Sequence, residues 1–332
     1  MKKFKDQRGW AEGLPFYKGN LHSHTTNSDG CLSPQESVRL FKAHGYSFLC
    51  LSEHDRYTDY RPDFDTGDFI ILPGLEASAI LREKPGSQNR IRVHHMQGIL
   101  GTEAMQAAAP KHLAHLEVLP PPVYFESWDG AAVAQQLCET LQSCGCLVTY
   151  NHPVWSRVLP QEFLELEGAF ALEIYNYNTV NESGTGADTT YWDLMLRAGK
   201  HINGFASDDN HNEGKFDDAC GGWVMVGAPA LTHDAITGAL AAGCYYSSSG
   251  PQITGWGVRG DRVWVDCSPC ARVNFIAGGF LNAGATVIAP AGTTLYHAET
   301  ALRGDETYLR VECIDANGKT AWTNPLFLAG AE

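Results

Sequence analysis

Six apolar runs in the first 211 residues each lead into histidine or acidic residues. In α/β proteins the carboxyl ends of parallel strands meet at one edge of the sheet, where binding and catalytic groups gather. Ionisable side chains at the end of a buried strand are costly unless they are solvated, paired or bound to a ligand. The runs therefore predict an α/β fold with one shared polar site. The residues concerned are His22 and His24, Glu53 to Asp55, Glu76, His94 and His95, His152, and Asp208 to His211.

Amphipathic segments between these runs predict helices. The clearest begins at Ser33-Pro34-Gln35-Glu36, a capping box with proline at the first helical position, and ends at Gly45. We expect further helices near residues 129–144, 189–199 and 232–243. The alternation of strands and helices favours a mostly parallel sheet, either doubly wound or closed into a barrel.

The pattern changes twice along the chain. Residues 101–127 carry alanine-rich and proline-rich pieces and are expected to form an excursion or a partial lid near the active site. After Gly250-Pro251 short alternating runs follow, and Asp315-Ala316-Asn317-Gly318 is typical of a hairpin turn. We therefore predict an α/β domain over residues 1–252 and a small all-β, sandwich-like domain over residues 253–332.

Net charge limits the partners of this chain. Its 38 acidic and 24 basic residues give a formal charge of −14, which repels phosphate backbones and anionic lipid. No apolar run reaches the roughly 20 residues that a membrane-spanning helix needs. Residues 1–6 are basic but lack the apolar stretch of a secretory signal. We expect a cytoplasmic protein that acts on a small molecule rather than on nucleic acid or membrane; the sequence does not indicate an oligomeric state.

The ten cysteines are scattered along the chain. Cys267-Ser268-Pro269-Cys270 has the spacing of half a zinc site or of a redox pair, but a second cysteine or histidine pair is missing nearby. We therefore expect reduced, structural cysteines.

Spacing within the polar ends indicates metal binding. His22 and His24 are two residues apart, so on a strand both rings point to the same face. Asp209 and His211 repeat that relation. Imidazole and carboxylate together suit zinc, manganese or iron(II). His94 and His95 cannot both point inward from one strand, and His95 is preferred because Gly98 follows it in a His-x-x-Gly arrangement.

The order of these motifs resembles the PHP (polymerase and histidinol phosphatase) superfamily over about residues 17–250. That resemblance implies a distorted (β/α)7 barrel, a TIM-like fold, with up to three metal ions at the carboxyl ends of the strands. Glu53 departs from the pattern, because the family usually has aspartate before this histidine. The motifs are His22-x-His24, Asp29, Ser52-Glu53-His54-Asp55, Glu76, His95, Asn151-His152-Pro153 and Asp209-x-His211.

The resemblance also implies three ligand sets. One ion would take His22, His24, Glu76 and Asp209. A second would share Glu76 and add His95 and His152, and a third would use Asp29, His54 and His211. Residues 310–325 are similar to the end of a branch that includes carbaryl-hydrolase-like proteins, whose substrates are varied.

The expected chemistry is hydrolysis with two or three divalent ions. A hydroxide between the ions bridged by Glu76 would attack phosphorus or a carbonyl carbon. Asp55 and His94 are candidates for the general acid, and Arg56 and Arg157 for gripping a substrate anion.

Three functions follow from this reading of the sequence. The first is a phosphoesterase acting on a small, anionic, phosphorylated substrate. The second is a carboxylic ester, carbamate or amide hydrolase with the same metals. The third is a scaffold in which the metals only stabilise the fold and the β domain recognises a partner or a glycan; because every motif is present, this third function is the least favoured.

Overall fold

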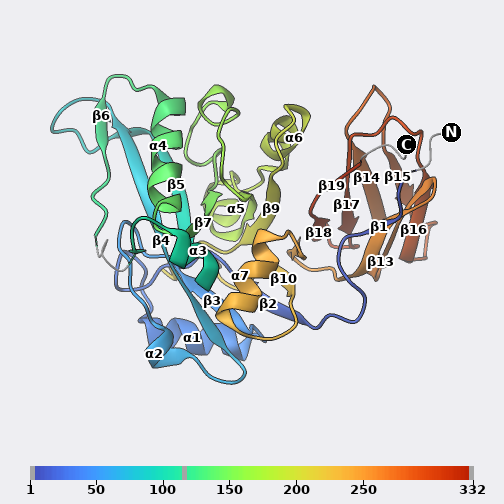
Figure 1. The fold of residues 1–332 in the computed structure, drawn as a ribbon, viewed down its shortest axis with the longest axis horizontal. Coiled ribbons are helices and arrows are strands. Elements are labelled where there is room, and N and C mark those ends of the chain that lie inside the picture. Colours follow the sequence, from blue (N-terminus) through green and yellow to red (C-terminus); the bar gives the residue numbers. More distant parts are fainter. Residues whose placement is uncertain (1–3, 114–117, 329–332) are drawn as a thin grey trace.

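A computed structural model describes residues 4–113 and 118–328 (Figure 1). It has a helix-flanked α/β region and a β region formed mainly by the C-terminal strands. The predicted α/β class is confirmed as a mixed α/β fold that is rich in sheet. No helix among the described residues is both long enough and apolar enough to cross a membrane.

The sheet of the α/β region is mixed rather than mostly parallel. Parallel pairs join β2 (Phe16–Asn20), β3 (Phe48–Leu51) and β4 (Ile70–Arg82), and also β7 (Cys146–Tyr150), β8 (Ala171–Asn176) and β9 (Asn203–Ser207). Between these two sets, β5 (Arg90–Leu100) runs antiparallel to both β4 and β7. The parallel prediction fails here because only residues 83–89 join β4 to β5, and so short a connection returns the chain antiparallel.

Four helices form where the sequence predicts them. At the first, the Ser33 Oγ accepts a hydrogen bond from the Glu36 N–H at 3.3 Å, and the Glu36 carboxylate accepts one from the Ser33 N–H at 2.9 Å, which satisfies two free donors of the first turn. These helices are α1 (Pro34–Ala43), α4 (Gly130–Gln142), α6 (Thr189–Arg197) and α7 (His233–Ala241), and the shorter ones are α2 (Arg61–Phe64), α3 (Glu103–Ala108) and α5 (Tyr177–Ser183).

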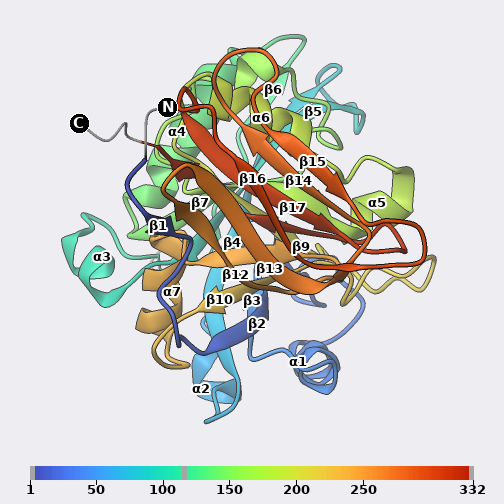
Figure 2. The same cartoon turned by 90° about the vertical axis from the view of Figure 1, so that its right-hand side faces the viewer.

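The β region packs two sheets over an apolar core (Figure 2). One sheet has the order β1-β12-β13-β16, and the other joins the sheet of the α/β region through β11 and β10. β1 pairs with β12, and β11 pairs with β18, so strands from both sides of residue 252 share each sheet. The domain division predicted at residue 252 stays a prediction. The strands are β1 (Gln7–Arg8), β10 (Trp223–Gly227), β11 (Tyr245–Ser248), β12 (Ile253–Arg259), β13 (Arg262–Cys270), β14 (Arg272–Ala277), β15 (Ala285–Ile288), β16 (Leu295–Ala301), β17 (Tyr308–Ile314), β18 (Thr320–Thr323) and β19 (Leu326–Phe327).

Backbone hydrogen bonds continue beyond the strand ends and bring the polar segments together. The Asp209 N–H donates to the His22 carbonyl at 2.9 Å, which joins the extensions of β9 and β2. The Glu76 N–H donates to the Glu53 carbonyl at 3.1 Å, and the Asn151 N–H donates to the His95 carbonyl at 3.0 Å. Segments far apart in sequence are thereby held side by side at one edge of the sheet.

Candidate metal centre

All nine side chains predicted as metal ligands lie in one cluster. Glu76 and His95 reach it from within β4 and β5, rather than from strand ends as predicted, because these two strands continue past the site as antiparallel partners. The cluster opens into a cavity of about 240 Å³. Its members are His22, His24, Asp29, His54, Glu76, His95, His152, Asp209 and His211.

The first group of ligand atoms is the most deeply buried. His22 Nε2 and His24 Nε2 lie 3.1 Å apart, and Asp209 Oδ1 is 3.1 Å from the former and 3.0 Å from the latter. Glu76 Oε1 lies 3.2 Å from His22 Nε2. These four residues are the set that the resemblance implies for one ion.

The second group shares Glu76. Its Oε1 atom lies 3.3 Å from His95 Nδ1 and 3.2 Å from His152 Nε2, and these two nitrogens are 3.4 Å apart. His54 Nδ1 approaches the other oxygen of Glu76, Oε2, at 3.1 Å. His54 therefore borders this group as well as the third.

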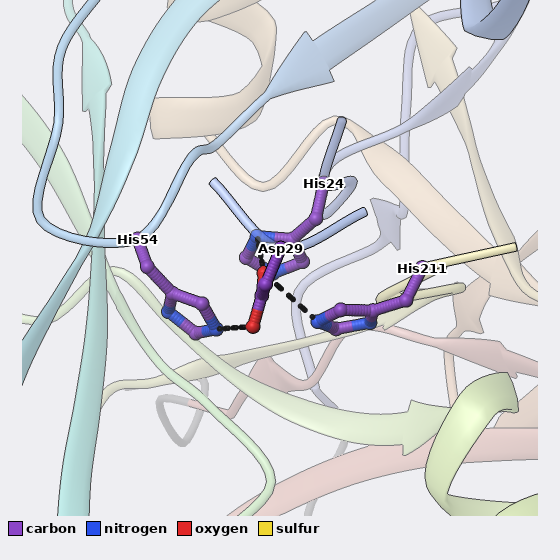
Figure 3. Close-up of side chains that lie close together, drawn as sticks. All are labelled: His24, Asp29, His54 and His211. Carbon is purple, nitrogen blue, oxygen red and sulfur yellow. Dashed lines mark ion pairs between the residues drawn. The ribbon is translucent and has the colours of Figure 1, made fainter. Parts of the chain in front are cut away.

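The third group, drawn in Figure 3, is the most exposed of the three, since 57% of the Asp29 side chain is accessible to solvent. Asp29 Oδ1 is 3.4 Å from His211 Nε2, and Asp29 Oδ2 is 3.6 Å from His54 Nε2. His24 turns its Nδ1 atom toward Asp29 Oδ1 at 3.9 Å, while its Nε2 atom faces Asp209 in the first group. The structure thus adds His24 to the three residues implied for this position.

The arrangement of these atoms fits divalent cations. Ligand atoms about 2.1 Å from one tetrahedral ion lie about 3.4 Å from each other, close to the separations in the first two groups. The buried atoms Glu76 Oε2, Asp209 Oδ1 and His54 Nδ1 have no hydrogen-bond partner. His22 Nδ1 donates to Glu173, so the neutral ring presents a lone pair at Nε2. Unpartnered lone pairs that converge in a buried space are the donor set of a metal site.

The pKa values reflect the close packing of carboxylates and imidazoles in the cluster. Burial lowers the pKa of His24, but the close approach of the Asp209 and Glu76 carboxylates outweighs burial and raises it to about 10. Burial raises the pKa of Glu76, and the surrounding histidines outweigh burial and hold it well below its ordinary value. The carboxylates therefore need a balancing positive charge, which either protons or metal ions can provide.

Glu173 is a buried residue of this site that the sequence analysis missed. Its Oε1 accepts the hydrogen bond from His22 Nδ1 at 2.9 Å, and its Oε2 accepts from the His152 N–H at 3.0 Å and from Asn176 Nδ2 at 3.0 Å. The signal was a lone carboxylate inside the apolar run Leu172-Glu173-Ile174. Glu173 orients His22 and fixes which of its nitrogens carries the proton.

Polar neighbours hold three other members of the cluster. Asn151 Nδ2 donates to Glu76 Oε1 at 2.8 Å, and Asn178 Nδ2 lies 3.1 Å from His211 Nδ1. Ser156 Oγ lies 3.0 Å from His152 Nδ1. The contacts to His152 and His211 leave the Nε2 atom of each ring facing the cluster.

The mouth of the cavity carries groups that the sequence did not single out. Arg90 and Trp155 line it, with the Arg90 guanidinium 5.8 Å from the Trp155 ring. Trp155 Nε1 donates to Glu182 Oε2 at 2.7 Å. An adjoining groove of about 430 Å³ shares these three residues and adds Arg157, a predicted anion-binding residue.

Asp55 and Arg56, predicted as catalytic, do not line the cavity. Asp55 Oδ1 accepts a hydrogen bond from the Ser78 N–H at 2.7 Å, and burial raises the pKa of Asp55 to about 6. Arg56 is exposed and forms a backbone bridge with Val118. Catalytic roles for these two residues stay predictions without support from the geometry.

The structure separates His94 from His95. His94 Nδ1 lies 2.5 Å from the Tyr150 hydroxyl, and its ring stacks on Trp128, so it points away from the cluster that His95 joins.

The described part of the 101–127 segment lies outside the cavity lining, and residues 114–117 lie outside the described residues. The predicted lid therefore has no structural support.

Comparisons with known proteins give a likeness at low sequence identity. No protein-family model matches the chain, and neither does any curated protein. Among solved structures, the chain is similar to a two-domain protein from Bacteroides vulgatus that contains a predicted PHP-like metal-dependent phosphoesterase (13% identity, 98% of this chain and 99% of that one, TM-score 0.45). It is also similar to a putative metal-dependent phosphoesterase from Bifidobacterium adolescentis (14%, 59% and 88%, TM-score 0.36). A third similar structure is an amidohydrolase from Chromobacterium violaceum (15%, 68% and 96%, TM-score 0.37).

Proposed function

We propose that this chain is a metal-dependent hydrolase of small phosphate esters, with two or three divalent ions held by the nine clustered side chains. The position of Glu76 carries the proposal. Its Oε1 atom lies 3.2 Å from both His22 Nε2 and His152 Nε2, and its Oε2 atom lies 3.1 Å from His54 Nδ1. A carboxylate that faces several groups of ligand atoms can bridge ions, and bridged ions serve hydrolytic reactions.

Zinc, manganese and iron(II) all suit a set of imidazole and carboxylate ligands. When bound, such ions supply a hydroxide at neutral pH and stabilise the charge that develops on the substrate. The chain's own contribution is to hold the ligands in place. Glu173 at His22 Nδ1 and Ser156 at His152 Nδ1 orient both rings so that Nε2 faces the cluster.

We further propose that the α/β region is a distorted (β/α)7 barrel of the PHP type within residues 1–252. In support, the His24 N–H donates to the Asn210 carbonyl at 3.1 Å, which joins the extension of β2 to that of β9. β10 pairs with β2 on its other side. A ring built in this way would bring the ligand-bearing segments of these strands together, as the resemblance implies.

An anionic substrate suits the mouth of the cavity. Arg92 is paired with Glu162 at 3.1 Å, whereas Arg90 and Arg157 have no carboxylate partner within ion-pair distance among the described residues. Two guanidinium groups beside a metal cluster can accept the non-bridging oxygens of a phosphate or a second anionic group of the substrate. This favours a phosphate ester over a neutral one.

A carboxylic ester, carbamate or amide substrate is the second candidate. Trp155 and Phe216 line the same cavity and offer flat apolar surface, and Glu182 and Glu213 place negative charge beside them. Such a lining accepts an uncharged aryl group more readily than a polyanion. The same ligand cluster would serve attack at a carbonyl carbon.

Parallel assays on an aryl phosphate, an aryl carbamate and an aryl acetate, with and without a chelator, test the proposal. We expect chelator-sensitive hydrolysis of the phosphate, and a rise of about tenfold in KM for Arg157→Gln, because one charge-assisted hydrogen bond is lost. Arg39→Gln is the matched control, since Arg39 is an exposed arginine on α1, away from the cavity. Turnover of the carbamate or acetate alone would favour the second candidate, and turnover that survives chelation would refute both.

A further inference from the structure

A second cavity, of about 600 Å³, lies against the β1-β12-β13-β16 sheet of the β region. It shares no lining residue with the metal cavity or its adjoining groove. Its floor is the outer face of β13 and β16, and residues 8–16 form one wall. Its volume falls within the range of about 300–1,000 Å³ found for small-molecule sites.

The ring of Trp264, on β13, forms part of the cavity floor. Trp264 is partly exposed on β13, and the neighbouring Gly255 has no side chain to cover it, since a Cβ there would lie 3.3 Å from the ring. The guanidinium carbons of Arg8 and Arg259 lie 5.8 and 5.7 Å from the ring centre. Both guanidinium groups therefore lie over the Trp264 ring within cation–π distance.

The wall of the cavity is also aromatic and is fixed in place. Trp10 stacks on Tyr246 at 5.7 Å between ring centroids and meets Phe16 edge-on at 5.1 Å. The wall approaches the sheet closely at Gly9, where any Cβ would overlap the ring of Trp256. The site is therefore formed before a ligand arrives, which lowers the entropic cost of binding.

The charges that line the cavity are balanced. Three arginines and three carboxylates take part, and most are paired: Arg8 with Glu12 at 3.0 Å, Arg262 with Glu299 at 2.9 Å, and Asp266 with His297 at 2.6 Å. A lining without net formal charge gives little attraction to either an anion or a cation. It offers fixed donors and acceptors around an aromatic ring instead.

We propose that this cavity binds a short neutral oligosaccharide. Each sugar hydroxyl both donates and accepts hydrogen bonds, so it can pair with a guanidinium and a carboxylate that already face each other. The apolar C–H face of a pyranose ring can pack against the part of the Trp264 ring that the two guanidinium groups leave exposed, while the hydroxyls at the edge of the sugar reach Asp266 and Glu299. The α/β region would then act on a substrate while the β region holds a glycan.

Isothermal titration calorimetry of the full-length, metal-loaded chain with maltotriose, cellotriose, xylotriose, mannotriose and triacetylchitotriose tests this proposal. We expect saturable binding of at least one of them, with a dissociation constant below about 10 mM. Trp264→Ala should weaken that binding about tenfold through loss of the stacking surface. Glu299→Gln, which preserves side-chain shape, should weaken it about fivefold.

The matched control is Tyr296→Ala, an exposed aromatic on the same strand as Glu299 that does not line the cavity; binding should be unchanged. The proposal fails if none of the five sugars binds below about 10 mM. It also fails if Trp264→Ala, Glu299→Gln and Tyr296→Ala weaken binding equally, or if adenosine monophosphate binds in a Trp264-dependent manner while no sugar does.

Discussion

The α/β region and the β region bury different chemistry at their centres. His22, His24 and Glu76 are fully buried in the α/β region, and each faces other ionisable groups. In the β region the corresponding central positions are held by Val263, Val311 and other apolar side chains. Apolar burial stabilises a fold without further partners, whereas buried charges stabilise one only when they are compensated. The ligand cluster of the α/β region should therefore depend on bound charge, and the apolar core of the β region should not.

The largest expected effect is on catalysis, from Asp209→Ala. This change removes a carboxylate that lies within 3.1 Å of two histidine nitrogens, and we expect kcat to fall by on the order of 10³-fold. Metal content, measured on the purified variant, should fall as well. Near-wild-type turnover with a full metal complement would show that the cluster is not the active site.

Next in size is the effect of Glu173→Gln on metal affinity. Glutamine keeps the shape of the side chain but cannot hold the proton of His22 Nδ1 as a carboxylate does, so we expect metal affinity to fall by about 10- to 100-fold. Competition with a chromogenic chelator measures this. Glu162→Gln is the matched control, because its carboxylate contacts Arg92 and Trp128 and no histidine. Equal losses in both variants would assign Glu173 a purely structural role.

The β region should respond in the opposite way. Val311→Ala opens space in a fully buried apolar position and should lower the free energy of unfolding by about 2 kcal/mol. Metal content and kcat should stay unchanged, because Val311 touches the sandwich core and not the ligand cluster. Urea titration, with metal analysis of the folded protein, provides the test. Loss of metal in this variant would mean that the two cores are coupled.

The same contrast explains what the sequence could predict. Helix caps, strands and the histidine spacing are local, so α1 forms where it was predicted, and His22 and His24 lie together as their spacing indicated. The antiparallel course of β5 was missed because Glu76 was expected at the end of its strand, whereas β4 continues to Arg82 and leaves only seven residues before β5 begins. Arg90 reaches the cavity only through that reversal. Residues placed by long-range contacts therefore needed the structure.

A buried acid outside the cluster gives the finest test of this comparison. Asp188 Oδ1 accepts a hydrogen bond from the Val154 N–H at 3.1 Å, and its buried Oδ2 has no hydrogen-bond partner. Burial raises the pKa of Asp188 from 3.8 to about 8. The folded protein binds this proton more tightly than the unfolded chain does. The contribution of Asp188 to the free energy of unfolding is therefore greatest below about pH 4, and it is lost as the pH rises toward 8.

Asp188→Asn should remove that dependence. We expect the free energy of unfolding of the wild type to fall relative to this variant between about pH 4 and pH 8, measured by urea titration at each pH. Asp63→Asn, at an exposed position on α2, controls for the substitution itself. Parallel curves for the wild type and Asp188→Asn would mean that solvent or a neighbouring group compensates the Asp188 carboxylate. In that case the dependence of the α/β core on bound charge would be confined to the metal cluster.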